Sequence, residues 1–266
     1  MVRAMNPAPD RPPRFVLIRG LAREAGHWRD FDRALLSRFP SACVERHDLP
    51  GNGDQRLRST PLRIDAIAED LRARVNQAGA PAPILIAVSL GAMACIAWLQ
   101  RWPDDPVRGL VAINTSVGGL CRPWQRIQPR GLMHVLHAIA TADPLARERR
   151  ILALTSSRFG QDLGLARAHA AIHEQRPIAR LSVARQLIAA AAFRASGPLP
   201  GSTPMLLLES AGDRLVDPIC SQRIAASFAA HREVHPSAGH DLSLDDPQWA
   251  AARIAAWVER RSLEPE

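Results

Sequence analysis

A serine stands between a buried strand and a helix in this sequence, and that junction constrains the fold more than any other feature. The run from Ile84 to Val88 is wholly apolar, as in a strand buried on both faces, and Leu90 to Arg101 is typical of a helix. Ser89 lies between them, with Ala87 two residues before it and Gly91 two residues after it. Small residues at both positions permit a sharp turn that exposes a serine hydroxyl at the carboxyl edge of a sheet. The junction therefore predicts an α/β fold and makes Ser89 a candidate nucleophile.

An acid and a histidine follow the serine, each in the loop after a predicted strand. A serine hydroxyl is a poor nucleophile until a base takes its proton, and the base needs a carboxylate to fix its tautomer. The chain order Ser89, Asp213, His240 is that of one serine-hydrolase architecture. We therefore predict these three residues as catalytic. Asp217 is the alternative acid, although Pro218 directly after it is typical of a helix that begins with an aspartate cap.

Strand and helix patterns alternate along most of the chain, which predicts a parallel sheet. The expected strands are 15–18, 42–49, 84–88, 109–114, 205–209 and 232–235, and the expected helices between and after them are 26–38, 61–77, 90–101, a helix from 218, and 247–261. Residues 117–200 interrupt the alternation with expected helices at 132–141, 144–157, 163–174 and 178–195. We predict a core of 15–116 and 201–266, a helical cap of 117–200 over Ser89, and a disordered lead-in of 1–14.

The charge of this chain has an unusual source, because every basic residue is arginine and the net charge is +8. Without lysine there can be no Schiff base, P-loop lysine or Ser-Lys dyad. The arginines are scattered rather than clustered with aromatic residues, so we expect no nucleic-acid partner. No apolar run reaches membrane-spanning length and the first residues do not resemble a secretory signal, which predicts a cytoplasmic protein without a membrane partner. The four cysteines form no C-x-x-C pair and are expected to be small buried hydrophobes.

Several short motifs occur in an order that resembles the α/β-hydrolase family. They are Arg19-Gly20-Leu21 with Trp28 downstream, Asp48-Leu49-Pro50-Gly51-Asn52-Gly53, the serine turn, Asp213-x-x-Val216, and Gly239-His240 followed by Pro247. The chain looks like a small bacterial serine esterase with a helical cap, similar to carboxylesterases and pimeloyl-acyl-carrier-protein methyl ester esterases. By that resemblance, the backbone amides of Leu21 and Leu90 form the oxyanion hole.

The sequence departs from the family pattern in three respects. Arg19 replaces the usual histidine before the oxyanion loop, and Ala87 replaces the commoner glycine. Arg19 could bind a substrate carboxylate or pair with an acid in the core. The family's N-terminal antiparallel hairpin is expected to be missing, because only fourteen residues precede the first predicted strand.

The function these features predict is hydrolysis of a carboxylic ester through an acyl-enzyme, with no cofactor and no metal. The apolar cap implies a small-molecule ester with an apolar acyl or aryl part. Two alternatives remain open: a thioesterase or acyl-carrier-protein-linked ester hydrolase, and a non-catalytic binding protein of hydrolase fold. An acidic carrier protein would be attracted by arginines of the cap, which are Arg122, Arg126, Arg130, Arg147, Arg149 and Arg150. His169 and His173 are four residues apart and would share one helix face, which with Glu174 could suggest a metal site, but the sequence places no third ligand.

Overall fold

One parallel sheet forms the centre of the molecule. The computed structural model describes residues 12–76, 79–195, 197–199 and 203–262. Its strands have the order β2-β1-β3-β4-β5-β6, and every neighbouring pair is parallel. The strands are β1 (Arg14–Ile18), β2 (Cys43–His47), β3 (Pro83–Val88), β4 (Gly109–Ile113), β5 (Met205–Ser210) and β6 (His231–His235). The expected six-stranded parallel sheet is confirmed.

The start of the chain can be compared with the sequence only in part. Of the expected lead-in, residues 1–11 lie outside the described residues, and Arg14 already belongs to β1. Within the described part of the chain, no strand precedes β1. Arg14 is held there by Glu45 of the neighbouring strand, with its Nε 2.6 Å from Oε1.

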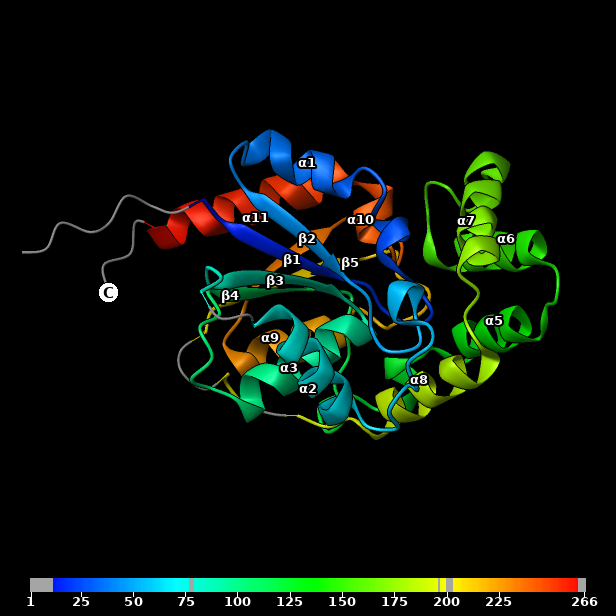
Figure 1. Cartoon of the computed structure of the whole chain (residues 1–266), viewed down its shortest axis with the longest axis horizontal. Coiled ribbons are helices and arrows are strands. Elements are labelled where there is room, and N and C mark those ends of the chain that lie inside the picture. The colour runs from blue at the N-terminus through cyan, green and yellow to red at the C-terminus, as the bar shows by residue number, and fades with distance from the viewer. Residues whose placement is uncertain (1–11, 77–78, 196, 200–202, 263–266) are drawn as a thin grey trace, which may run out of the picture.

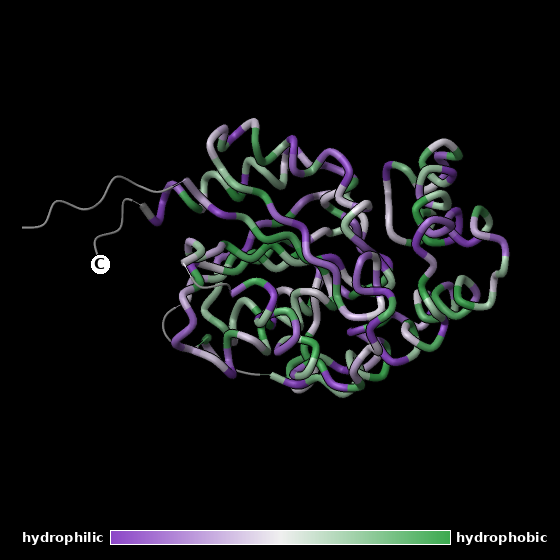
Figure 2. Tube along the Cα trace, in the orientation of Figure 1, coloured by the Kyte–Doolittle hydropathy of each residue, from purple (hydrophilic) through white to green (hydrophobic). Residues whose placement is uncertain are grey.

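Helices cover both faces of the sheet (Figure 1). The helices α1 (Phe31–Arg38) and α11 (Pro247–Ser262) lie on one face, and α2 (Ile64–Val75), α3 (Leu90–Arg101) and α9 (Ile219–Phe228) lie on the other. Alternate residues of β3 enter two different apolar cores: Leu85 packs with α2 and α3, whereas Ile86 packs with α1 and α11. Because successive side chains point to opposite faces, a strand buried on both sides must be apolar throughout. Figure 2 shows the resulting apolar centre.

Among the described residues, five helices are inserted between β4 and β5 and lie at one end of the sheet (Figure 1). This helical insertion comprises α4 (Pro123–Arg126), α5 (Pro129–Ala140), α6 (Pro144–Thr155), α7 (Leu163–Gln175) and α8 (Arg180–Ala192). Aspartate caps begin two of them: Asp143 accepts from the amide of Ala146, and Asp162 from the amide of Leu165. The sequence predicted α5 to α8 with small differences at their ends but missed α4, whose single turn is too short to produce a periodic pattern.

Three further local features differ from the expectation. The helix expected over 26–38 is broken into a 3₁₀ helix, η1 (Ala25–Trp28), and α1, because Arg29 adopts a φ of 51°. The short helix α10 (Leu242–Asp245) was not expected. Cys43 is exposed, whereas the other three cysteines are buried as predicted.

No helix in the described residues has the length and apolar character needed to cross a bilayer.

Candidate functional site

Ser89 lies on a strained turn between β3 and α3. Its φ of 53° and ψ of −116° are unfavourable for a residue with a side chain, and surrounding contacts maintain them. The amide of Ser89 donates to the carbonyl of Ile113 at 2.8 Å, and the Thr115 hydroxyl donates to the carbonyl of Ser89 at 2.9 Å. A Cβ at Gly91 would lie 2.6 Å from the carbonyl oxygen of Arg19. The turn therefore requires glycine at 91, because backbone cannot move aside as a flexible side chain can.

Asp213 and His240 meet at the carboxyl edge of the sheet. The Nδ1 atom of His240 lies 2.7 Å from Oδ2 of Asp213, and both residues are buried. The other carboxylate oxygen, Oδ1, accepts the amides of Leu215 at 2.8 Å and Val216 at 3.0 Å. These two amides fix the orientation of the carboxylate, and the remaining oxygen holds the imidazole so that Nδ1 carries its proton and Nε2 can accept one.

The other acids considered from the sequence have local structural partners. Asp217 accepts from the amide of Ile219 at 3.0 Å, at the start of α9. Asp48 accepts from the amides of Ala25 at 2.7 Å and Asp54 at 2.9 Å, which joins two loops beside the sheet. Their carboxylates satisfy backbone donors, whereas Asp213 satisfies both backbone donors and a histidine.

Asn114 positions the loop that carries His240, and its role was not recognised from the sequence. Asn114 follows β4 and is buried; its Nδ2 donates to the carbonyl of His240 at 2.8 Å and to the hydroxyl of Ser210 at 2.9 Å. Asp245 binds the same loop by accepting from the amide of Gly239 at 2.7 Å. Asparagine and aspartate at strand and helix ends are common in any sequence, so pattern alone gave no signal for these contacts.

The loop expected to supply the oxyanion hole is held to the histidine loop by Arg19. Its guanidinium contacts both carboxylate oxygens of Asp241, at 3.0 Å and 2.5 Å, and the hydroxyl of Ser243 at 2.9 Å. It also lies over the Trp28 ring, 5.0 Å from the centroid. Burial raises the pKa of Asp241, but the charge and hydrogen bonds of Arg19 outweigh it and lower that pKa to about 2. The structure thus pairs Arg19 with a core acid.

The helical insertion holds the same loop from its other side. Gln186 of α8 is buried and accepts from the amide of Ala22 at 2.9 Å. Arg23 contacts Glu148 of α6, with Nη1 2.7 Å from Oε2. Leu21 therefore lies in a loop fixed on both sides, and Leu90 is the first residue of α3. Both residues line the same cavity, and the first amides of a helix have no acceptor within that helix.

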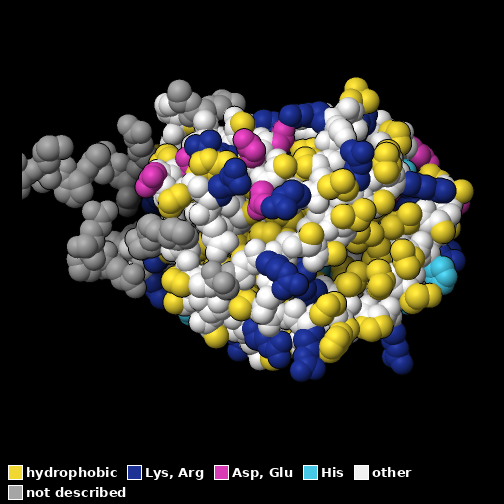
Figure 3. All heavy atoms as spheres, turned by 90° about the horizontal axis from the view of Figure 1, so that it is seen from below, with side chains coloured by type: hydrophobic (Ala, Val, Ile, Leu, Met, Phe, Trp, Pro, Cys, Tyr) yellow, Lys and Arg dark blue, Asp and Glu magenta, His cyan; other side chains and the backbone are white. Residues whose placement is uncertain are grey.

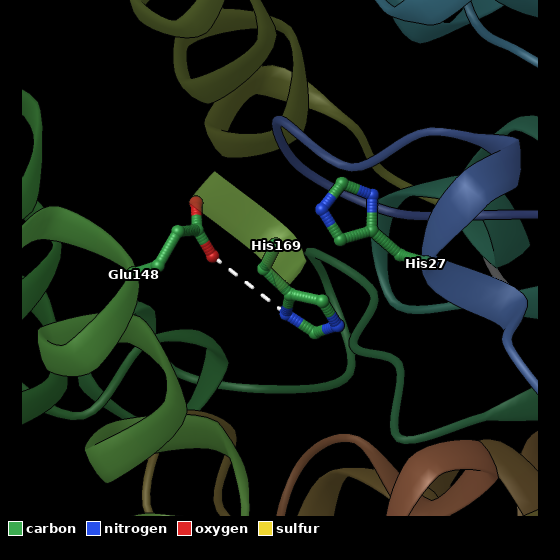
Figure 4. Close-up of side chains that lie close together, drawn as sticks. All are labelled: His27, Glu148 and His169. Atoms are coloured by element: carbon green, nitrogen blue, oxygen red, sulfur yellow. Dashed lines mark ion pairs between the residues drawn. The ribbon is translucent and has the colours of Figure 1, made fainter. Parts of the chain in front are cut away.

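Three potential metal ligands meet between η1 and the insertion (Figure 4). The ligand atoms of His27, Glu148 and His169 lie within 4.8 Å of one another. However, Nη1 of Arg23 is 2.9 Å from Nε2 of His27 and 2.7 Å from Oε2 of Glu148. The guanidinium already supplies the positive charge between these two atoms, and its repulsion opposes a second cation, so the cluster does not fit a metal.

His169, His173 and Glu174 do not together form a group of potential metal ligands in the described residues. His173 contacts Arg147, with Nε2 2.6 Å from Nη1, and Glu174 is exposed. His169 is buried and neither of its ring nitrogens has a hydrogen-bond partner. Burial, followed by the charge of Arg23, lowers the pKa of His169 to about 3, so its ring is neutral at pH 7.

A cavity of about 640 Å³ joins the sheet edge to the helical insertion. Ser89, Leu21, Leu90 and His240 line it from the core. Apolar side chains line it from the insertion, including Ile127, Val135, Ile139, Ile151, Leu154 and Leu187. The arrangement can bind an apolar group next to a serine, an imidazole and the amides of two neighbouring turns.

Comparisons with known proteins agree with this architecture. The family model described as "Alpha/beta hydrolase family" matches residues 15–253. Among solved structures, a putative aryl esterase from Burkholderia cenocepacia is 22% identical with a TM-score of 0.70, covering 94% of this chain and 90% of that one. An enol-lactonase from Burkholderia xenovorans LB400 is 17% identical with a TM-score of 0.74, covering 94% and 92%.

A third solved structure has a different stated activity. The RedJ thioesterase of the prodiginine biosynthetic pathway in Streptomyces coelicolor is 18% identical with a TM-score of 0.61, covering 95% of this chain and 90% of that one. No curated protein matches the chain. At these identities the solved structures show the fold alone, but the family model spans most of the sequence. The sheet, the serine turn and this match together show that the chain belongs to the alpha/beta hydrolase family.

Proposed function

We propose that this protein is a serine hydrolase that cleaves a carboxylic ester, with Ser89, His240 and Asp213 as its catalytic residues. The observation that carries the proposal is the 2.7 Å contact between Nδ1 of His240 and Oδ2 of Asp213, because His240 lines the same cavity as Ser89. That contact orients the imidazole and leaves its Nε2 available to accept a proton.

The reaction proceeds in two stages on these residues. Nε2 of His240 takes the proton of the Ser89 hydroxyl as Oγ attacks the ester carbonyl, and the amides of Leu21 and Leu90 stabilise the oxyanion. His240 then gives the proton to the departing alcohol, which leaves an acyl-enzyme. In the second stage His240 takes a proton from water, the resulting attack releases the acid, and the proton returns to Ser89.

The contacts of the core support the mechanism because they fix each group separately. Two backbone amides orient the Asp213 carboxylate, and the Asn114 side chain holds the carbonyl of His240. The Arg19–Asp241 pair holds the loop of Leu21 next to the loop of His240. Such preorganisation means that little reorganisation is needed as charge develops in the transition state. The helical insertion acts as the cap that closes an apolar pocket over the ester.

The substrate that this cavity supports is a small-molecule ester with an apolar acyl or aryl part. Its apolar lining favours such groups and does not by itself distinguish an ester from a thioester. The four cysteines, all free, suit a reducing compartment, and we propose a cytoplasmic location on that basis.

The test is hydrolysis of p-nitrophenyl esters of increasing chain length by the wild type and by Ser89→Ala. Ser37→Ala is the matched control, because Ser37 lies in α1 and donates to a backbone carbonyl there. Ester hydrolysis that is lost in Ser89→Ala and kept in Ser37→Ala supports the proposal. A matched panel of acyl thioesters distinguishes a thioesterase by the ratio of the two kcat/KM values. Binding of esters without any turnover would instead indicate a binding protein.

A further inference from the structure

The charges around the cavity are strongly unbalanced. Among the described residues that line it, eight are arginines and two are acids, Glu148 and Asp241. Both acids are already paired, Asp241 with Arg19 and Glu148 with Arg23. The lining arginines without an acidic partner in the cavity are Arg122, Arg126, Arg147, Arg180, Arg194 and Arg223. An apolar cavity for a neutral ester needs no such surplus, so the arginines require a separate explanation.

Four of these arginines gather at one part of the cavity wall, and we name them the rim arginines: Arg122, Arg126, Arg194 and Arg223. They come from separate segments of the chain: α4 with the residue before it, the residues after α8, and α9. Gly118 shows how close they are, because a Cβ there would lie 2.9 Å from Nη1 of Arg126 and 3.2 Å from Cγ of Arg194. Arg223 joins them by donating to the carbonyl of Leu120 at 3.2 Å and to Oε1 of Gln125 at 2.8 Å.

Neutral groups, rather than carboxylates, receive the hydrogen bonds given by the rim arginines. Arg126 donates to the carbonyls of Ala190 and Ala191, and its buried Nε has no partner. Asp217 is in the same region, but its carboxylate accepts from the amide of Ile219 at the start of α9. Burial lowers the pKa of Arg126; the charge of Arg194 acts in the same direction, whereas the thiols of Cys121 and Cys220 oppose it. Like charges held together without a carboxylate partner raise the energy of the free protein, and a bound anion would relieve that repulsion.

The surface agrees with this charge distribution. Figure 3 shows apolar side chains gathered in a hollow, with arginine side chains beside it, while the acidic side chains in view lie away from it. The rim arginines and the nucleophile Ser89 line the same cavity. A ligand can therefore contact the rim arginines while its apolar part lies along the wall.

We propose that the rim arginines bind an anionic group of the substrate, a carboxylate or a phosphate, at the part of the molecule away from the ester that Ser89 attacks. This inference rests on the proposed function and specifies its substrate class. Guanidinium groups suit these anions because two parallel N–H donors match two oxygens. The substrate is then an amphiphile, with an ester at the serine, an apolar stretch against the cavity wall and a negative charge at the rim.

The experiment compares three p-nitrophenyl esters of the same chain length. One carries a free carboxylate at the far end, one carries a phosphate there, and one carries a methyl ester as the uncharged twin. At low salt, kcat/KM for at least one anionic ester should exceed that of the twin by about 10- to 100-fold, as expected for hydrogen bonds to a charged group. The preference should fall as salt rises, because the rim is partly exposed to solvent. Preference between the carboxylate and the phosphate identifies the source of the charge.

Paired arginine variants assign the effect to the rim. In Arg194→Gln/Arg223→Gln the anionic-to-neutral ratio of kcat/KM should fall close to one. The control is Arg149→Gln/Arg150→Gln, which removes the same charge from exposed arginines of α6 that do not line the cavity and should keep the ratio. A ratio also cancels any loss of folded enzyme, since both esters are measured on the same sample.

Two outcomes would overturn the inference. A neutral ester hydrolysed as well as both anionic esters would show that the rim binds no anion of the substrate. An equal fall of the ratio in the Arg149→Gln/Arg150→Gln control would show attraction by net charge instead of a site. Either result leaves Ser89-dependent hydrolysis of the neutral ester intact, so it is distinguishable from failure of the proposed function, in which none of the esters is hydrolysed in a Ser89-dependent way.

Discussion

Two arginines four residues apart, Arg19 and Arg23, connect the same loop to different parts of the molecule. Arg19 pairs with Asp241 of the core, and its charge is balanced by that carboxylate and a serine hydroxyl. Arg23 pairs with Glu148 of the helical insertion, beside two buried histidines. In the core, the charges of Arg19 and Asp241 cancel. At the insertion, protonation of His27 or His169 would add a positive charge beside that of Arg23. We infer that the contacts in the core hold the catalytic residues in position. The contacts to the insertion should depend more strongly on pH.

The largest expected effect is the loss of ester hydrolysis when the proposed nucleophile in the core is removed. Ser89→Ala should lower kcat for ester hydrolysis by roughly 10³–10⁶-fold without lowering the melting temperature, because it removes the nucleophile and little packing. Adding His240→Ala should cost little more, since the two residues act as one unit. Steady-state kinetics on purified protein measure both, with Ser37→Ala as the control. Retention of a tenth of wild-type activity in Ser89→Ala would refute the nucleophile assignment.

The second prediction concerns the acid that orients the imidazole. Asp213→Asn should reduce kcat by about 10²–10⁴-fold, because an amide permits the wrong imidazole tautomer. Asp217→Asn is the matched comparison and should mainly weaken the cap of α9, by about 0.5–2 kcal/mol at most. Kinetics and urea unfolding of both variants separate the two roles. A silent Asp213→Asn together with an inactive Asp217→Asn would reverse the assignment.

The third prediction tests the buried ion pair between Arg19 and Asp241. Asp241→Asn leaves the guanidinium of Arg19 buried without a negative partner and should lower the free energy of unfolding by about 3–5 kcal/mol. Asp65→Asn, at the exposed Arg63–Asp65 pair, should change it by less than about 1 kcal/mol. Urea unfolding at pH 7 measures both. Similar values for the two variants would show that the buried pair does not join the loops as inferred.

The smallest expected effect is a loss of folding stability at low pH, caused by the buried histidines beside the insertion. The pKa of His169 is lowered to about 3 by burial and then by Arg23, against about 6.5 in an unfolded chain. The unfolded chain therefore binds more protons between these values, so stability is complete above about pH 6.5 and is lost as the pH falls toward about 3. At pH 5 the loss from this residue is about 2 kcal/mol. Burial also lowers the pKa of His27 well below its usual value, which acts in the same direction.

Urea unfolding between pH 7 and pH 5 checks this dependence. His169→Gln should make it shallower, because glutamine cannot take up the proton, and His137→Gln should leave it unchanged, since His137 is exposed on α5. Glu148, 3.8 Å from Nδ1 of His169, offers a partner to the protonated ring, whereas Arg23 opposes it. An unaltered pH dependence in His169→Gln would show that the charge on this ring does not control the stability of that region.

Local sequence patterns predicted strands and helices well where burial of apolar side chains dominates. The run at β3 is apolar because both its faces are buried, and α3 begins and ends at the residues expected. The expected helix over 26–38 failed because Arg29 takes a positive φ that its residue type does not signal. The one-turn helices α4 and α10 were missed because four residues cannot establish a period.

The arginines of the insertion show where pattern stops being informative. Of the cap arginines selected from the sequence, Arg122, Arg126 and Arg147 line the cavity, whereas Arg130, Arg149 and Arg150 do not. Arg194 and Arg223 join them from positions that no spacing rule would connect. Side chains from separate helices meet only after those helices have packed, and packing depends on angles that a linear pattern does not contain.

By itself the sequence determined the alternation of strands and helices, the serine turn and the order of the candidate catalytic residues, because each depends on residues close together or on the order of the chain. Only the tertiary structure decided which acid approaches His240, that Arg19 pairs with an aspartate 222 residues away, and which arginines surround the cavity. The physical reason is that local preferences select elements, whereas contacts between distant side chains arise from how those elements exclude water together.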